Sequence, residues 1–195
     1  MSAEQPSVVV LAGPNGAGKS TAAPLLLRGA MGLTVFVNAD VIAQGLAAYD
    51  PEGAALAAGR IMLARLHELA AQRQSFAFET TLAARSFAPW LRRLLTDGYH
   101  FHLAYLWLPS AEAAIERVAE RVLTGGHDIP EDVVRRRYEG GLRNFHRIYQ
   151  PLASSWAMYD NGHGSPPRLV AFGAAEEINI VDADIWRSSL AAAGS

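Results

Sequence analysis

The sequence has no cysteine and almost no lysine. Of its 17 Lys and Arg residues, only Lys19 is a lysine. The absence of cysteine excludes a disulfide framework and a thiolate metal site. No apolar run approaches the roughly 18 residues that indicate a membrane span, and the polar start MSAEQPS lacks the layout of a signal peptide. We therefore expect a cytoplasmic protein that has no membrane partner.

Charge is also scarce. Charged residues make up 18% of the chain and hydrophobic residues 50%, and the formal net charge is -2. This balance gives no general attraction for polyanions, so nucleic acid is not an expected partner and phosphate binding must be local. With 195 residues the chain is long enough to bury a core. We expect a single domain over residues 1–195.

Near-continuous apolar runs alternate with amphipathic segments, which is typical of a parallel sheet covered on both faces. We therefore expect an α/β three-layer fold with a mainly parallel sheet. Two helices within residues 110–150 have no strand between them and suit a helical lid, and a turn rich in Asn, Gly and Pro follows at 159–167. The expected strands are 7–13, 33–40, 75–81, 100–109, 168–173 and 178–184, and the expected helices are 19–28, 51–72, 85–96, 110–123 and 130–146.

The stretch GPNGAGKST follows the first expected strand and opens a helix, which is the context that the phosphate-loop pattern G-x-x-x-x-G-K-[ST] requires. The glycines let backbone N–H groups surround phosphate oxygens at a helix N-terminus. The Lys19 ammonium is a compact point charge that can reach the β and γ phosphates, and a planar guanidinium is not an equivalent substitute for it. Ser20 can offer its hydroxyl to Mg²⁺. The expected nucleotide-binding residues are Gly13, Pro14, Asn15, Gly16, Ala17, Gly18, Lys19, Ser20 and Thr21.

A phosphate loop indicates a nucleotide but not its use. A GTPase usually reads guanine with an Asn-Lys-x-Asp segment, for which this chain lacks a second lysine. A transporter-type ATPase carries Leu-Ser-Gly-Gly-Gln and a strand that ends in Asp-Glu, and neither occurs here. The remaining interpretation is a phosphotransferase that uses ATP and Mg²⁺ and has its own acceptor site. A regulatory or switch protein that binds ATP without a small-molecule acceptor stays open as the alternative.

Two carboxylates lie at or near the ends of two consecutive expected strands. Asp40 ends the second strand and Glu79 lies near the end of the third, where ligands of open α/β sheets bind. An attacking hydroxyl must be oriented and must lose its proton, so we expect Asp40 to be the base. A structural role remains open for both: Asp40 as the cap of a helix starting at Val41, and Glu79 as an ordinary strand-end charge. The hydroxyl of Thr80 is a further candidate for contact with substrate.

Arginines crowd the two expected lid helices. Arg117 and Arg121 share a helix face, and a cation that arrives over the transferring phosphate is what a kinase lid supplies. Acidic residues at helical spacing also allow a solvated, ion-paired face. Asp128 and Glu131 resemble a capping box around Pro130. The second helix carries Arg135, Arg136, Arg137 and Arg143.

Several stretches together resemble the zeta-toxin family of phosphate-loop kinases, in particular its shorter bacterial members. They are LAGPNGAGKST, FVNADVIA, FETTLA, ERVAERVLTGGHDIPEDVVRRRYEGGLRNF, and YDNG followed by PRLVAFG. The resemblance implies that Asp40 activates the acceptor hydroxyl, that Glu79 binds the substrate, and that Arg117 or Arg121 is the first lid arginine.

The same resemblance implies an activity and a partner. Well-studied zeta toxins phosphorylate the 3′-hydroxyl of the amino sugar in UDP-N-acetylglucosamine, with ATP or GTP as donor, and a small helical antitoxin neutralises them. This chain is shorter than they are. The expectation is a kinase for a small hydroxyl acceptor, for which a nucleotide sugar is the first candidate and an antitoxin protein is a candidate partner.

Overall fold

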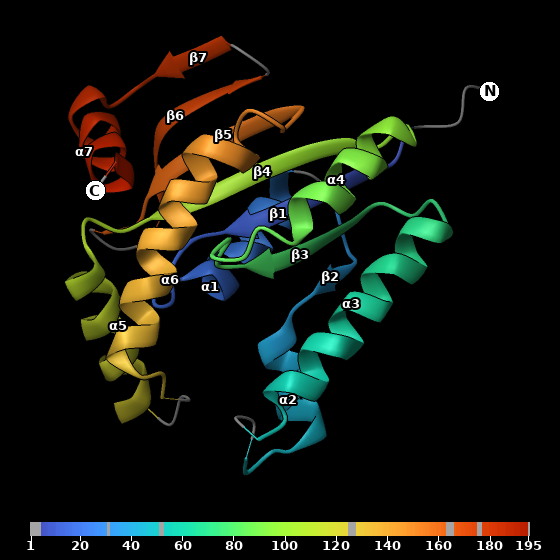
Figure 1. Ribbon diagram of the computed structural model, residues 1–195, viewed down its shortest axis with the longest axis horizontal. Helices are drawn as coiled ribbons and strands as arrows, with labels where there is room; N and C mark the ends of the chain where they lie inside the picture. The colour runs from blue at the N-terminus through green and yellow to red at the C-terminus, as the bar shows by residue number, and fades with distance from the viewer. Residues whose placement is uncertain are drawn as a thin grey trace.

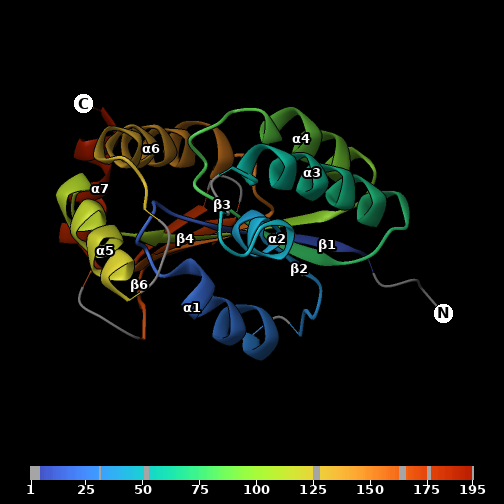
Figure 2. The same ribbon diagram turned by 90° about the horizontal axis from the view of Figure 1, so that it is seen from below.

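The structure is a computed structural model that describes residues 5–30, 32–50, 53–124, 128–162, 166–174 and 177–194. The described residues form a seven-stranded sheet in the order β2-β3-β1-β4-β5-β6-β7, with helices on both faces (Figures 1 and 2). The strands are β1 (Ser7–Ala12), β2 (Phe36–Val37), β3 (Phe76–Thr80), β4 (His100–Trp107), β5 (Ser155–Asp160), β6 (Arg168–Ala174) and β7 (Glu177–Ile180).

The parallel part of the sheet is the centre of the core. β1 pairs in parallel with β3 and β4, and β2 and β5 continue the parallel pairing on the two sides. Val8, Val10, Phe76 and Phe78 are all fully buried, as continuous apolar strands covered on both faces must be. The strand order changes direction at β1, so a crevice opens beyond its carboxyl end. The expected α/β three-layer fold with a mainly parallel sheet is confirmed.

Helices connect the strands, and α3, α4 and α6 lie on the face opposite α1 (Figure 2). Pro24 has no N–H with which to continue the first α-helix, and the chain widens there into a π-helix. No described helix is long and apolar enough to cross a membrane. The helices are α1 (Lys19–Ala23), η1 (Pro24–Ala30), α2 (Ala39–Leu46), α3 (Ala55–Ala71), α4 (Phe87–Thr96), α5 (Ala111–Leu123), α6 (Glu131–Asn144), η2 (Phe145–Tyr149) and α7 (Ala183–Gly194).

The sequence interpretation missed two elements near the C-terminus. Residues 155–160 form β5, a parallel strand, although no strand was expected there. The strand expected over 178–184 ends at Ile180, and Ala183 already begins α7. β6 and β7 pair antiparallel with their neighbours, so the C-terminal edge of the sheet reverses direction.

The two expected lid helices are α5 and α6, and they contact each other. In Figure 1 they lie to one side of the carboxyl ends of the strands, with α2 and α3 on the other side. The expected capping box is wrong, because Pro130 precedes α6 without a side-chain cap and Asp128 accepts a hydrogen bond from the N–H of Ile129 instead. The Gly-Gly-His segment at 125–127 lies outside the described residues.

Candidate active site

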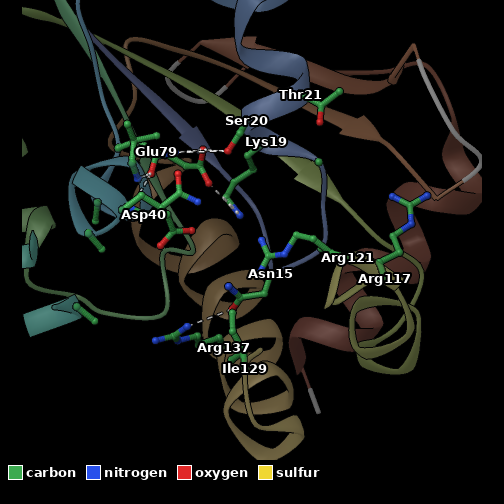
Figure 3. A pocket seen from close by; sticks show the side chains of 18 residues that line it. Asn15, Lys19, Ser20, Thr21, Asp40, Glu79, Arg117, Arg121, Ile129 and Arg137 are labelled. Carbon is green, nitrogen blue, oxygen red and sulfur yellow. Dashed lines mark hydrogen bonds and ion pairs between the residues drawn. The ribbon is translucent and has the colours of Figure 1, made fainter. Parts of the chain in front are cut away.

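A cavity of about 460 Å³ lies beyond the carboxyl ends of β1 and β3. Its walls come from the phosphate loop, from α2, from the end of β3 and from the helical pair α5–α6 (Figure 3). Four cationic side chains and two carboxylates are among its lining residues, so the cavity suits an anionic ligand. The lining residues are Asn15, Gly16, Gly18, Lys19, Ser20, Thr21, Asn38, Ala39, Asp40, Val41, Ala43, Gln44, Ala55, Glu79, Arg117, Arg121, Ile129 and Arg137.

The phosphate loop takes the conformation that its glycines permit. Gly16 and Gly18 have φ angles of 77° and 74°, in the left-handed region that glycine adopts without strain. The loop turns directly into α1, whose first residue is Lys19. The first residues of α1, Lys19 to Thr21, therefore border the cavity, and a helix N-terminus favours phosphate binding.

Lys19 is a buried cation. Its ammonium donates a hydrogen bond to the carbonyl of Pro14 at 2.8 Å and lies 3.7 Å from a carboxylate oxygen of Glu79. Burial lowers the pKa of the Lys19 ammonium, and Arg121 acts in the same direction. The carboxylates of Glu79 and Asp40 oppose that shift, so they favour the charged form that a phosphate needs.

Glu79 joins the phosphate loop to the start of α2. Its Oε2 accepts hydrogen bonds from the hydroxyl of Ser20 at 2.9 Å and from the amide of Asn38 at 2.8 Å. The register of the parallel pair places Leu11 of β1 beside Glu79 of β3. The carboxylate is therefore held beside Ser20 and Lys19, and oxygen donors of this kind are the ligands that Mg²⁺ prefers.

Asp40 does not cap α2. The cap is Asn38, whose side-chain oxygen accepts hydrogen bonds from the N–H groups of Asp40 and Val41, and the helix starts at Ala39. The structure contradicts the alternative that Asp40 caps the helix, because the side chain at position 38 already satisfies those donors. Among the residues that the structure describes, none donates a hydrogen bond to the Asp40 carboxylate, which lines the cavity.

The helical pair brings three arginines to the cavity. Figure 3 shows Arg121 extending toward the region of Lys19 and Asn15, whereas the guanidinium of Arg117 is directed away. Arg117 instead donates a hydrogen bond to the carbonyl of Gly162 at 3.2 Å. Arg137 of α6 reaches Asn15 in the phosphate loop, 3.4 Å from its side-chain oxygen. The two candidates on α5 thus have different surroundings.

Arg137 was not among the expected site residues, although a signal for it exists. The buried residues of α6 include Val134, Tyr138 and Gly141, and position 137 lies on the border of that face at helical spacing. Arg135 and Arg136 point elsewhere, to ion pairs with Glu112 and Asp132. The interpretation as an ion-paired face therefore holds for these two arginines.

Thr80 does not line the cavity. Its hydroxyl accepts a hydrogen bond from the N–H of Leu82 at 3.1 Å, which shapes the turn after β3. Gly13, Pro14 and Ala17 also do not line the cavity, and all three are buried within the loop. The rest of the expected nucleotide-binding loop from Asn15 to Thr21 borders the cavity.

Comparison with known protein families identifies one that matches most of the chain. The model of the family described as "Zeta toxin" matches residues 1–162. An uncharacterized protein of Haemophilus influenzae is 31% identical over 134 residues, which are 69% of this chain and 94% of that protein.

Comparison with solved structures reports on the fold. A chain of the AvrRxo1-ORF1:AvrRxo1-ORF2 complex with sulphate ions has a TM-score of 0.75 at 17% identity, covering 95% of this chain and 63% of that one. The present chain thus spans less than two thirds of that relative. The same complex with ATP gives a TM-score of 0.72. A structure of the PezAT toxin-antitoxin system of Streptococcus pneumoniae gives 0.64 at 15% identity, with 100% and 88% of the two chains covered.

Proposed function

The chain belongs to the zeta-toxin family of phosphate-loop kinases, and we propose that it transfers the γ-phosphate of ATP to a hydroxyl group of a small molecule. One observation carries the proposal: the Asp40 carboxylate lines the same cavity as Lys19, Ser20 and the arginines Arg121 and Arg137. A base, a phosphate cradle and cations around one space are the parts that phosphoryl transfer needs.

The donor side of the cavity is built for a nucleoside triphosphate with Mg²⁺. The loop N–H groups and Lys19 bind the phosphates, while Ser20 and Glu79 supply oxygen atoms on the metal side. When bound, Mg²⁺ neutralises charge on the β and γ phosphates. An ATP complex of a structural relative supports ATP as the donor, and GTP is the alternative donor to test.

The acceptor side begins at Asp40. A hydroxyl beside this carboxylate can donate its proton as the oxygen attacks the γ-phosphorus, and the bond to the β–γ bridging oxygen breaks as ADP leaves. Arg121 and Arg137 approach from the helical pair and stabilise the charge on the equatorial oxygens. In this scheme α5 and α6 act as a lid that completes the site over the bound substrates.

The family supports a proposal for the acceptor and for the partner. We propose a nucleotide sugar as acceptor, with UDP-N-acetylglucosamine as the first compound to test. The PezAT relative is a toxin-antitoxin system, and an antitoxin protein that blocks the cavity is the partner we propose for this chain. Without an acceptor, the same site would serve only as an ATP-dependent switch, and acceptor-dependent formation of ADP separates the two functions.

The substitution Asp40→Asn tests the mechanism. It keeps the shape of the side chain but removes the proton acceptor, so we expect phosphate transfer to fall by about a hundredfold or more while ATP affinity changes by less than about threefold. Transfer is followed by mass spectrometry of the acceptor, and ATP binding by calorimetry. If UDP-N-acetylglucosamine is not phosphorylated, a metabolite extract incubated with ATP reveals the acceptor as a new phosphorylated species.

Asp184→Asn is the matched control. Asp184 also lies in the first turn of a helix but belongs to α7, and it is ion-paired with Arg187 outside the cavity. The Asp184→Asn variant should retain phosphate transfer. Asp184 shares with Asp40 only the favourable interaction of a carboxylate with a helix N-terminus. Full transfer by the Asp40→Asn variant would remove Asp40 from the mechanism.

A further inference from the structure

The segment Asp160–Gly162 at the end of β5 touches the phosphate loop, α5 and β6 at once. Asn161 binds the loop, Gly162 binds Arg117 of α5, and Asp160 forms an ion pair with Arg168 of β6 at 2.6 Å. Asp160 is 1% exposed. The segment is thus held firmly at the sheet, and its other two residues contact parts of the cavity wall.

Asn161 holds the middle of the phosphate loop. The residue is only 8% exposed, and its amide nitrogen donates a hydrogen bond to the carbonyl of Ala17 at 2.8 Å. Its own backbone N–H donates to the carbonyl of Trp107 at the end of β4. A carbonyl can only accept, so the amide has one possible orientation here. The Ala17 carbonyl is directed to Asn161, away from the cavity.

The loop is packed tightly between Asn161 and α5. A Cβ atom at Gly18 would lie 2.8 Å from the amide nitrogen of Asn161, and one at Gly16 would lie 2.8 Å from the carbonyl of Ala114. A Cβ at Gly16 would also be 3.0 Å from the Cβ of Arg117. Neither position therefore has room for a side chain.

Gly162 joins the same segment to α5. Its carbonyl accepts the hydrogen bond of Arg117, and its N–H donates to Asp160 at 2.8 Å. A Cβ at Gly162 would lie 3.0 Å from Pro109, the residue that leads from β4 toward α5. Both α5 and the phosphate loop are thus hydrogen-bonded to the same segment, residues 160–162.

We infer that Asp160–Gly162 positions the phosphate loop for the nucleotide and ties α5 to it, with Asn161 as the positioning residue and Arg117 as the tether. Asn161 does not line the cavity, so it acts on the phosphates only through the loop. This role deepens the proposed kinase function and rests on it, because the loop matters in this way only if it binds a nucleotide.

The test is the affinity for ATP in Asn161→Asp and Asn161→Ala. At pH 8 the Asn161→Asp variant would set an ionised carboxylate against the Ala17 carbonyl, so we expect it to bind ATP about tenfold more weakly than the wild type and more weakly than the Ala variant. A role in packing alone predicts the reverse order, because Asp keeps the volume of Asn. Lowering the pH should restore binding by the Asp variant relative to the wild type, because a protonated carboxyl can donate to the carbonyl.

Asn144→Asp is the matched control. Asn144 is also a buried asparagine, and its amide donates to the carbonyls of Leu82 and Ala83, in the turn after β3. Urea unfolding should show comparable destabilisation of the two Asp variants, while ATP affinity should fall only for position 161. Equal ATP affinity of wild type and both position-161 variants would overturn the inference. Absence of ATP binding by the wild type would overturn the proposed function instead.

Discussion

The cavity has two unlike walls. The loop wall, residues 13–21 with Glu79, is fixed by backbone geometry and burial, and its cation Lys19 is 7% exposed. The arginine wall, formed by α5 and α6, contributes long side chains from two helices outside the sheet alternation. A rigid wall is suited to binding the phosphates of the ground state. Long cationic side chains are suited to stabilising the negative charge that develops during phosphate transfer. The difference suggests that the loop wall acts in both nucleotide binding and turnover, whereas the arginine wall acts mainly on turnover.

The largest effect should come from the loop wall. In Lys19→Ala the buried ammonium beside Pro14 and Glu79 is lost, and we expect turnover to fall by about a thousandfold or more, with weaker ATP binding. Lys19→Arg should be impaired less completely, because charge is kept but the planar fork does not fit the loop. Steady-state assays and calorimetry measure both quantities, and wild-type turnover in Lys19→Ala would contradict the assignment of the loop.

The arginine wall should respond in turnover more than in affinity. We expect Arg121→Ala to lower kcat by about a hundredfold with little change in ATP affinity, as when a transition-state cation is removed. Arg117→Ala should instead weaken ATP binding moderately, because Arg117 contacts Gly162. The exposed Arg136, paired with Asp132, provides the control. If the Arg121 and Arg136 variants have the same kcat, Arg121 has no catalytic role.

The smallest effect concerns the far end of the arginine wall, where η2 continues α6. The ring of His146 packs against Phe145 and Trp186 of α7, and burial lowers its pKa from 6.5 to about 4. Between these values the unfolded chain binds a proton that the native protein does not, so stability should fall as the pH drops from 6.5 to 4. Because His146 is partly exposed, we expect a loss of about 1–2 kcal/mol.

Urea unfolding at several pH values checks this expectation. His146→Gln should flatten the dependence on pH in that window, because the variant has no imidazole to protonate. His67→Gln makes the same change at an exposed position of α3 and should leave the dependence nearly unchanged. Parallel curves for the wild type and the His146 variant would show that the contact between η2 and α7 is insensitive to this proton.

The parallel core and the phosphate loop could be predicted from the sequence because their signals are local. Continuous apolar runs mark β1, β3 and β4, and the loop motif sits between a strand and a helix. β5 was missed because its alternating residues SWAMYD carry a weaker signal beside the Asn-Gly turn. The start of α7 was missed because the whole stretch INIVDAD resembles a strand, whereas β7 ends at Ile180 and α7 begins at Ala183.

The candidate site was predictable in part, for a related reason. Glu79 follows from its place near the end of β3. Asp40 was expected at the end of a strand over 33–40, but β2 ends at Val37 and Asp40 lies in the first turn of α2. Both carboxylates line the cavity. The choice among arginines depends on how α5 and α6 are turned toward the sheet, which tertiary packing decides. Arg137 was therefore not distinguished from its two neighbours, and Arg117 was not distinguished from Arg121. The alternative that Asp40 caps α2 stayed open in the sequence because Asn38 and Asp40 are both good capping residues.

The hydrogen bond from Lys19 to the carbonyl of Pro14 has a consequence for the energetics of nucleotide binding. The ammonium has already left water and already points along its own loop before a phosphate arrives. Little side-chain entropy remains to be lost on binding, and little reorganisation is required. On binding, the Lys19 ammonium exchanges the neutral carbonyl of Pro14 for a negatively charged phosphate oxygen, inside a loop that is already formed. The net gain from the contact between Lys19 and a phosphate is therefore smaller than the contact alone would give, because the bond to Pro14 is given up.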